Sequence, residues 1–327
     1  MKIKIIIPYF GKLHPLFDIY RLGITHNKCF DFMIITDQNL DDLKIKNLKV
    51  INQNFFELKE KIKKRLGVYP KDPYKLCDFK PLYGSIFKKY LIGYDYWGYS
   101  DIDMILGDLE PIRNIISKNK YDKILDLGHL SFYRNKKSVN NFYKKTNKIY
   151  RQYKYLLSSK RIWVTDESYS NIIYGVNRVL NSFGNGVYSK RNDFFDTNPC
   201  YEEFLNTNDI KCKFGFFEYN GEELFFVYQH ENKLIKKSFS YAHFLKKKIK
   251  IIKINSRFYF IPDHWSDTFK IEDLKLKIKN VHELRINNTY KNYLFRRKIK
   301  NFVIILKDCL FSFEAFKILL RILKFKN

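Results

Sequence analysis

The chain has 327 residues, of which 45% are apolar, so it can bury a large core as one big domain or two modest ones, and its composition excludes a disordered chain. Lys and Arg number 61 against 34 Asp and Glu, which gives a formal net charge of +27. This charge favours anionic partners such as nucleic acid, acidic lipid headgroups or phosphorylated substrates. The richness in Lys, Ile and Asn has a second explanation in coding composition, so the charge does not by itself identify DNA as the partner.

The cysteines and the apolar runs indicate the compartment. Five cysteines are scattered without a Cys-x-x-Cys pair, which argues against a disulfide framework and against structural zinc. The apolar run at the amino terminus is too short for a signal peptide, and nowhere do the ~18 uncharged apolar residues of a spanning helix follow one another. We expect a cytoplasmic protein, either free or peripheral on the inner face of the membrane.

The first part of the chain alternates between strand and helix patterns. Residues 2–7 are rich in isoleucine, with Lys at positions 2 and 4, which is typical of a strand that is covered on both faces, and Pro8 to Gly11 end it in a turn. Residues 30–37 and 48–52 predict two further strands, and residues 55–66 place their apolar positions on one helical face. This alternation predicts an α/β fold with a mostly parallel, doubly wound sheet.

The run from Asp95 to Asp108 begins as a buried aromatic strand and reaches Asp101-Ile102-Asp103. In an extended backbone, Asp101 and Asp103 project to one face while Ile102 anchors on the other. Two carboxylates at this spacing repel each other unless a cation lies between them, and oxygen ligands suit Mg²⁺ or Mn²⁺. The alternative is a strand end with two solvated carboxylates.

The same run resembles the metal-binding Asp-x-Asp motif of glycosyltransferases with the GT-A fold, which use nucleotide-sugar donors. Residues 107–111 are similar to the segment that follows this motif in glycogenin-like and lipopolysaccharide sugar transferases. Residues 74–81 and 94–103 together look closer still to an uncharacterised bacterial family of capsule and surface-polysaccharide genes. The likeness covers about residues 1–245, and it implies a Rossmann-like, mostly parallel sheet with flanking helices that binds Mn²⁺ or Mg²⁺ through Asp101 and Asp103.

The resemblance also implies where a nucleotide would lie. GT-A enzymes place the base against the loop after their first strand, which here contains Pro8, Tyr9 and Phe10. Asp37 follows the second strand, where similar enzymes bind the base or the ribose. The alternative for the loop of Pro8, Tyr9 and Phe10 is an ordinary strand-to-helix turn. The alternative for Asp37 is a turn that Thr36 or Asp37 caps.

A further block, Lys75 to Lys80, stands just before the metal motif and, by the same likeness, beside the donor. Lys75 and Lys80 suit a diphosphate, and Asp78 suits a sugar hydroxyl. The residues after it predict a helix that continues to about Leu91. The alternative for the two lysines is simple solvation, as for most lysines of this chain.

Two more groups of residues take roles from the resemblance. In similar transferases a late His completes the metal site, which predicts His243 as the third ligand, with Lys246 at the head of a Lys cluster near the diphosphate. A carboxylate near the acceptor comes from a helix start beyond the metal motif, which here offers Asp166 and Glu167. The structural alternatives are a core position for His243 and a favourable first helical turn for the two carboxylates. His129 stands beside apolar residues, and we expect it to be packed in the core.

The last part of the chain differs in composition. Asn220-Gly221 between two apolar runs predicts a β-hairpin. Residues 246–327 are richer in Lys, Ile and Leu, and we expect them to form a basic extension behind a catalytic domain of residues 1–245. Residues 294–326 combine an apolar face with Lys and Arg, so they can either pack on the core or lie on an anionic membrane surface.

The sequence thus favours a metal-dependent hexosyltransferase that moves a sugar from a nucleotide-sugar, a UDP-sugar above all, to a surface glycan or lipid-linked glycan. Likeness to glycogenin-type enzymes favours retention at the anomeric carbon. A phosphatase of the haloacid-dehalogenase type is the alternative enzyme, although the strand before Asp101 is Tyr-Trp-Gly-Tyr, which departs from the apolar strand of that family. A nucleic-acid-binding protein is the alternative outside enzymes, but the basic residues are spread along the chain and no known binding pattern is visible.

Overall fold

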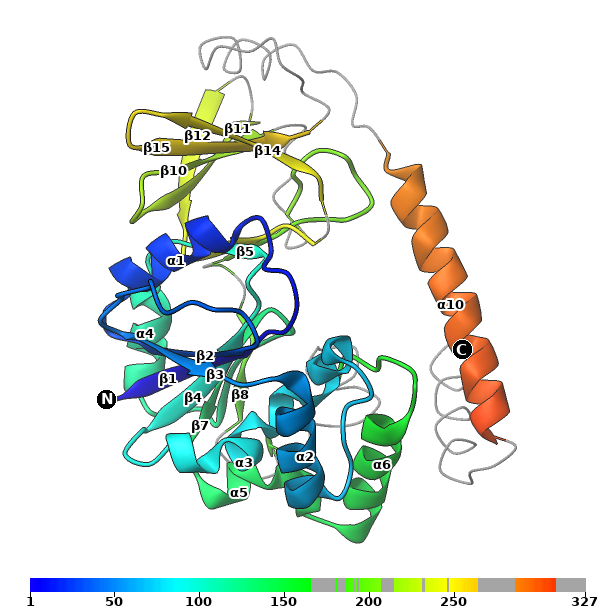
Figure 1. Cartoon of the computed structure of the whole chain (residues 1–327). Coiled ribbons are helices and arrows are strands. Elements are labelled where there is room, and N and C mark those ends of the chain that lie inside the picture. Colours follow the sequence, from blue (N-terminus) through cyan, green and yellow to red (C-terminus); the bar gives the residue numbers. More distant parts are fainter. Residues whose placement is uncertain are drawn as a thin grey trace.

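The computed structural model describes residues 1–165, 180–181, 186–190, 192, 194–206, 215–230, 233–245, 247–263 and 286–309. Figure 1 shows a mostly parallel sheet between helices, a second sheet beyond α1, and a long helix at the side of the molecule.

The central sheet has seven strands in the order β3-β2-β1-β4-β7-β6-β8. Strand β7 is antiparallel to both of its neighbours, whereas the other neighbouring pairs run parallel. The predicted α/β class with a mostly parallel sheet and flanking helices is therefore confirmed. The strands are β1 (Ile3–Pro8), β2 (Asp31–Thr36), β3 (Leu48–Asn52), β4 (Tyr96–Ser100), β6 (Lys123–Leu127), β7 (Leu130–Arg134) and β8 (Val187–Tyr188).

Helices cover both faces of this sheet because its strands are apolar on both sides. In β1 the side chains alternate, so Ile5 and Ile7 join the cluster that contains Phe17, while Ile6 joins the cluster that contains Leu58. Figure 1 shows the two helical layers on opposite sides of the sheet. The first layer contains α1 (Phe17–His26) and α4 (Glu110–Ser117). The second contains α2 (Phe55–Leu66), α3 (Tyr83–Ile86), α5 (Lys137–Asn140) and α6 (Asn147–Ser158).

The segment after α2 departs from the sequence prediction. Residues Pro73–Leu82 form a 3₁₀ helix, η1, and the continuous helix predicted to reach Leu91 is replaced by α3 and the 3₁₀ turn η2 (Lys88–Tyr90). Pro81 lies inside η1, where its missing N–H cannot donate to the preceding turn. The prediction of one long helix in this segment was wrong.

A second sheet is antiparallel, with the strand order β12-β11-β10-β15-β14. The predicted hairpin is confirmed, because β10 and β11 pair across Asn220 and Gly221, whose φ of 97° suits a glycine. The last two strands join this sheet although they follow residue 245. The predicted division at that residue runs between β13 (Tyr241–His243) and β14, and it stays a prediction. The strands are β10 (Gly215–Tyr219), β11 (Leu224–His230), β12 (Lys233–Phe239), β14 (Ile249–Ile254) and β15 (Arg257–Pro262).

A small third sheet joins segments from distant parts of the chain. It consists of β5 (Met104–Leu106), β13 (Tyr241–His243) and β9 (Phe194–Asp196), with β13 in the middle. In the register of this sheet, His243 is opposite Met104 on one side and Asp196 on the other. This register brings the two ends of the predicted metal site together.

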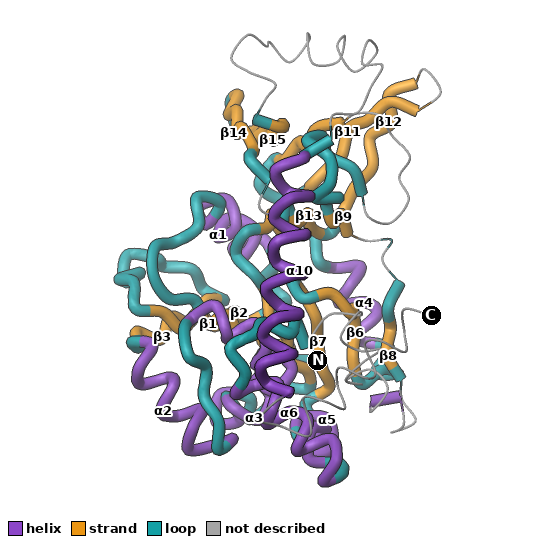
Figure 2. Tube along the Cα trace, turned by 90° about the vertical axis from the view of Figure 1, so that its right-hand side faces the viewer, coloured by secondary structure: helices purple, strands orange, loops and turns teal. Residues whose placement is uncertain are grey.

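Helix α10 (Asn288–Cys309) is the last described element. Its start is held by a β-bridge between Tyr201 and Ile286 and by a 2.9 Å hydrogen bond from the Asn287 N–H to the Cys200 carbonyl. Figure 2 shows it running along the side of the molecule from the antiparallel sheet to the level of α6. Within the described ranges, no helix is long and apolar enough to cross a membrane.

Candidate active site

The Asp-x-Asp segment links β4 to β5 at the carboxyl end of the central strand. Ile102 is buried, which anchors the link, and the Asp101 N–H donates to the His129 carbonyl at 2.8 Å. The side chains of Asp101 and Asp103 are each 33% exposed. Both carboxylates are therefore accessible at the edge of the sheet where ligands bind in open α/β folds.

His243 completes a cluster with these carboxylates. Asp101, Asp103 and His243 each offer one ligand atom, and these atoms all lie within 4.8 Å of one another. The His243 Nε2 lies 3.7 Å from Oδ2 of Asp103. The structure thus brings together the three residues predicted to hold a metal, from segments 140 residues apart in the chain (243 − 103). Their role as ligands stays a prediction.

Asp196 holds the other side of the His243 ring. Its Oδ1 lies 2.9 Å from Nδ1 of His243, as their pairing in neighbouring strands allows. A carboxylate that accepts the Nδ1–H fixes the tautomer of an imidazole and directs Nε2 toward a metal. His129 stacks on the same ring at 4.4 Å between centroids and is buried, in agreement with the packed position predicted for it.

The pKa values describe the cluster in the absence of a cation. Burial alone would lower the pKa of His243, but Asp103 and Asp196 raise it to about 10. Burial would raise the pKa of Asp103, but His243 lowers it to about 2. Burial raises the pKa of Asp101 in spite of the nearby Lys80 ammonium. The cluster thus holds an imidazolium between carboxylates, and a divalent cation would take the place of its proton.

Lys80 lies beside the cluster. Its Nζ is 2.7 Å from Oδ1 of Asp101 and donates to the Gly128 carbonyl at 2.6 Å. The side chain is buried, so its ammonium is directed by these two acceptors. Lys80 therefore positions the Asp101 carboxylate and connects it to the turn between β6 and β7.

Lys75 and Asp78 form a second ion pair, which is closed to solvent. The Lys75 Nζ lies 2.6 Å from Oδ2 of Asp78 and also donates to the carbonyls of Leu156 and Arg161. The Asp78 carboxylate accepts the backbone N–H groups of Trp163 and Val164. Both side chains are thus used to hold the segment that follows α6, and their contact with a donor stays a prediction.

The loop after β1 is ordered by Asp37, whose Oδ1 accepts the Gly11 N–H at 2.9 Å. Although burial acts in the opposite direction, this hydrogen bond lowers the pKa of Asp37. Pro8 ends β1, and the ring of Phe10 packs edge-on against Phe55. The hydroxyl of Tyr9 donates to the Lys12 carbonyl at 3.1 Å. Asp37 thus shapes the predicted base-binding loop, which is compatible with both a turn cap and a nucleotide contact.

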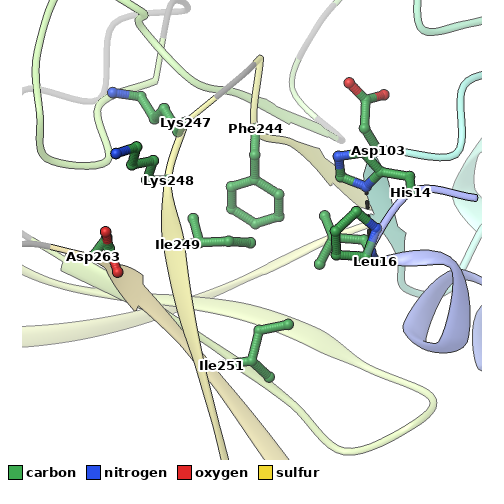
Figure 3. Close-up of a pocket in the computed structure, with 10 residues that line it drawn as sticks. His14, Leu16, Asp103, Phe244, Lys247, Lys248, Ile249, Ile251 and Asp263 are labelled. Carbon is green, nitrogen blue, oxygen red and sulfur yellow. Dashed lines mark hydrogen bonds between the residues drawn. The ribbon is translucent and has the colours of Figure 1, made fainter. Parts of the chain in front are cut away.

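A cavity of about 320 Å³ opens next to the cluster. Figure 3 shows Asp103 and His14 at one end and Lys247 and Lys248 at the other, with Phe244 and Ile249 between them. The Lys247 ammonium donates to the carbonyls of Tyr201 and Glu203. Asp263 also lines the lysine end, so carboxylates border the cavity at both ends. An anion that enters it would need a cation as well as the Lys248 ammonium to balance these charges.

The comparisons with known proteins identify a family. A family of unknown function, DUF6625, matches residues 5–270. The chain belongs to this family. No curated protein matches it.

Solved structures similar to this DUF6625 member include several transferases. The glycosyltransferase GlyE of Streptococcus pneumoniae TIGR4 is 12% identical, with a TM-score of 0.34 over 59% of this chain and 46% of GlyE. Mouse xyloside xylosyltransferase 1, apo form, is 7% identical, with a TM-score of 0.37 over 61% and 88%. Residues 1–349 of S. aureus TarS are 12% identical, with a TM-score of 0.27 over 44% and 48%. The matches span about half of the GlyE and TarS chains, and with such low TM-scores no functional inference rests on them.

Three predicted residues of this DUF6625 member, Asp166, Glu167 and Lys246, lie outside the described residues. Sequence reasoning also missed two residues of the site. Asp196 comes into contact with His243 only through the pairing of β9 with β13, and His14 lines the cavity from the turn before α1. No local motif marks either residue, and only the strand pairing could have revealed Asp196.

Proposed function

We propose that this protein is a metal-dependent glycosyltransferase that moves a sugar from a nucleotide-sugar donor to a glycan acceptor. The observation that carries the proposal is the convergence of Asp101, Asp103 and His243 at the carboxyl end of β4. The sequence resemblance to Asp-x-Asp transferases supports it, because that resemblance implies the same three residues as metal ligands.

The donor set fits a divalent cation. Two carboxylates and one imidazole whose ligand atoms lie within 4.8 Å of one another suit Mn²⁺, and the accessible carboxylates also suit Mg²⁺. Bound there, the ion would supply Lewis-acid stabilisation of the charge on the departing nucleotide diphosphate. Asp196 holds the His243 ring in place, and Lys80 holds Asp101.

The cavity beside Asp103 supports the proposed donor site. We assign the diphosphate to the space between Asp103 and Lys248, and the base of a UDP-sugar to the loop of residues 8–11, which Asp37 orders. A diphosphate there would meet the Lys248 ammonium at one end and the metal ligands at the other. A Lys ammonium attracts phosphate as a single positive charge, whereas an Arg guanidinium would bind two phosphate oxygens in a fixed geometry.

The acceptor side rests on the sequence alone. We assign to it Asp166 and Glu167, with a surface polysaccharide or a lipid-linked glycan as the acceptor. By the likeness to glycogenin-type enzymes, the reaction retains the anomeric configuration. In an inverting reaction one of these carboxylates would serve as the base, and its replacement by the amide would abolish transfer. Product stereochemistry by nuclear magnetic resonance distinguishes the two reactions.

The proposal is tested by calorimetric titration with uridine and guanosine diphosphates, in Mn²⁺ and in EDTA. We expect binding that requires Mn²⁺ in the wild type, and its loss in Asp103→Asn. The matched control is Asp42→Asn, which changes an exposed carboxylate away from the cluster. Failure of the wild type to bind either nucleotide in Mn²⁺ would overturn the proposal. Hydrolysis of phosphate esters by the same sample would favour a phosphatase instead.

A further inference from the structure

Helix α10 carries an apolar stripe that is exposed. Phe295, Ile299, Phe302 and Leu306 follow one another at intervals of four, three and four residues, which places them on one helical face. Their exposed fractions are 64%, 50%, 49% and 42%, and Val303 beside them is 43% exposed. In the described structure these side chains therefore do not pack on the core, which was one of the two alternatives that the sequence left open.

The opposite face of α10 is the one that approaches the rest of the protein. Leu294, Arg297, Asn301 and Ile304 are half-buried, and they also follow a helical spacing. At 100° per residue this second stripe lies on the far side of the helix axis from Phe295 and its neighbours. The apolar stripe consequently lies on the more exposed face of α10, a helix that Figure 1 shows beside the molecule and Figure 2 shows in front of it.

Basic residues border the apolar stripe. The exposed side chains of α10 next to it include those of Lys291, Arg296, Lys298 and Lys307. In the sequence of the helix only Asp308 is acidic. An apolar stripe with cationic borders matches the surface of a bilayer that contains anionic lipids, where the apolar side chains enter the acyl boundary and the ammonium groups meet the headgroups.

We propose that α10 lies in the plane of an anionic membrane surface and attaches the protein to it. The inference goes beyond the proposed function, since it does not depend on the chemistry of the donor site. A second copy of this chain is the competing occupant, because the spacing of the stripe also suits a helix pair. That pairing would bring together two cationic helices on chains of net charge +27 each, whereas an anionic surface complements the same charges.

The test is cosedimentation of the full chain with vesicles of phosphatidylcholine alone and of phosphatidylcholine with phosphatidylglycerol. We expect at least tenfold tighter binding to the anionic vesicles, weakened by salt. The variant F295S/F302S removes two stripe residues and should lose at least tenfold of this binding. Phe56→Ser is the matched control, because Phe56 is 67% exposed on α2. Circular dichroism of each variant verifies folding.

Three results would overturn the proposal. They are equal binding to both kinds of vesicle, unchanged binding of F295S/F302S, and a wild-type dimer in light scattering that this variant converts to a monomer without a change in vesicle binding. The last result would assign the stripe to a second copy. Nucleotide binding in Mn²⁺, measured on the same samples, separates the failure of membrane attachment from the failure of the proposed enzyme activity.

Discussion

Two Lys–Asp pairs begin in the same 3₁₀ helix, η1, yet their surroundings differ. Lys75 and Asp78 are 2.6 Å apart with side chains 2% and 0% exposed. Lys80 and Asp101 are 2.7 Å apart, but the Asp101 side chain is 33% exposed. The distances are almost equal, so the length of an ion pair does not tell which one belongs to a binding site. The difference lies in what the carboxylate oxygens can still contact.

The Lys75–Asp78 pair, which is closed to solvent, stabilises the fold, whereas the accessible Lys80–Asp101 pair belongs to the candidate site. Asp78 accepts two backbone N–H groups in addition to Lys75, and this set of partners compensates for its burial. Asp101 instead faces Asp103 and His243 across an accessible space. Replacing one residue of each pair should therefore separate stability from ligand binding.

The largest expected effect is that of Asp78→Asn on stability. The change leaves the Lys75 ammonium buried without its carboxylate, and we expect the free energy of unfolding to fall by about 4 kcal/mol. Urea unfolding followed by circular dichroism measures it. Asp42→Asn, at an exposed position, should change the same quantity by less than about 0.5 kcal/mol. Equal free energies of unfolding for Asp78→Asn and Asp42→Asn would contradict the stabilising role of the Lys75–Asp78 pair.

Asp101→Asn should have the opposite profile. It removes a charged oxygen from the cluster that we propose to bind the cation, and we expect Mn²⁺-dependent nucleotide binding to weaken by about 100-fold. The free energy of unfolding should change by about 1 kcal/mol or less, because the site is accessible. Calorimetry and urea unfolding on the same preparation measure both quantities. Nucleotide binding as tight as in the wild type would show that Asp101 belongs to a structural pair after all.

Asp196→Asn tests the positioning of His243. An amide in this place no longer selects the Nδ1–H tautomer, and we expect the affinity for Mn²⁺ to fall by about tenfold. Electron paramagnetic resonance of free Mn²⁺ measures the affinity, and the ¹⁵N chemical shifts of His243 report the tautomer. Asp196→Glu, which retains the carboxylate, should recover part of the loss. If both variants bind Mn²⁺ as tightly as the wild type and the His243 tautomer is unchanged, Asp196 does not position the ring.

The smallest effect concerns Lys247, whose hydrogen bonds go to backbone carbonyls. Burial lowers its pKa from 10.5 to about 8, although Glu203 acts in the opposite direction. Between these two values the unfolded chain binds more protons than the folded one, so this group makes the free energy of unfolding rise with pH.

We therefore expect the stability of the wild type relative to Lys247→Met to increase by about 1 kcal/mol between about pH 7.5 and pH 9.5. Urea unfolding at both values measures the difference. Lys248→Met is the control, and it should follow the wild type. A constant difference between wild type and Lys247→Met would contradict the lowered pKa.

The sequence predicted those features that local patterns determine. Strand β3 and helix α2 have the predicted bounds, because a short apolar run and a 3.6-residue period are properties of neighbouring residues. The carboxylates of Asp101 and Asp103 were likewise visible as a motif. Asp196 was not, because it meets His243 across 47 residues through strand pairing. The spacing of Lys75 and Asp78 was visible as well, but the distant backbone groups that enclose the pair were not.

The origin of both pairs in η1 has a thermodynamic consequence. Asp78 holds the backbone at Trp163 and Val164, and Lys80, two residues further along η1, holds Asp101. A ligand that displaces the segment after α6 would act on η1 and through it on the cation site. Reciprocity of coupling free energies then requires that the cation change the affinity for that ligand by the same factor. A short 3₁₀ helix would thus make the coupling free energy between the two ligands a measurable property of this protein.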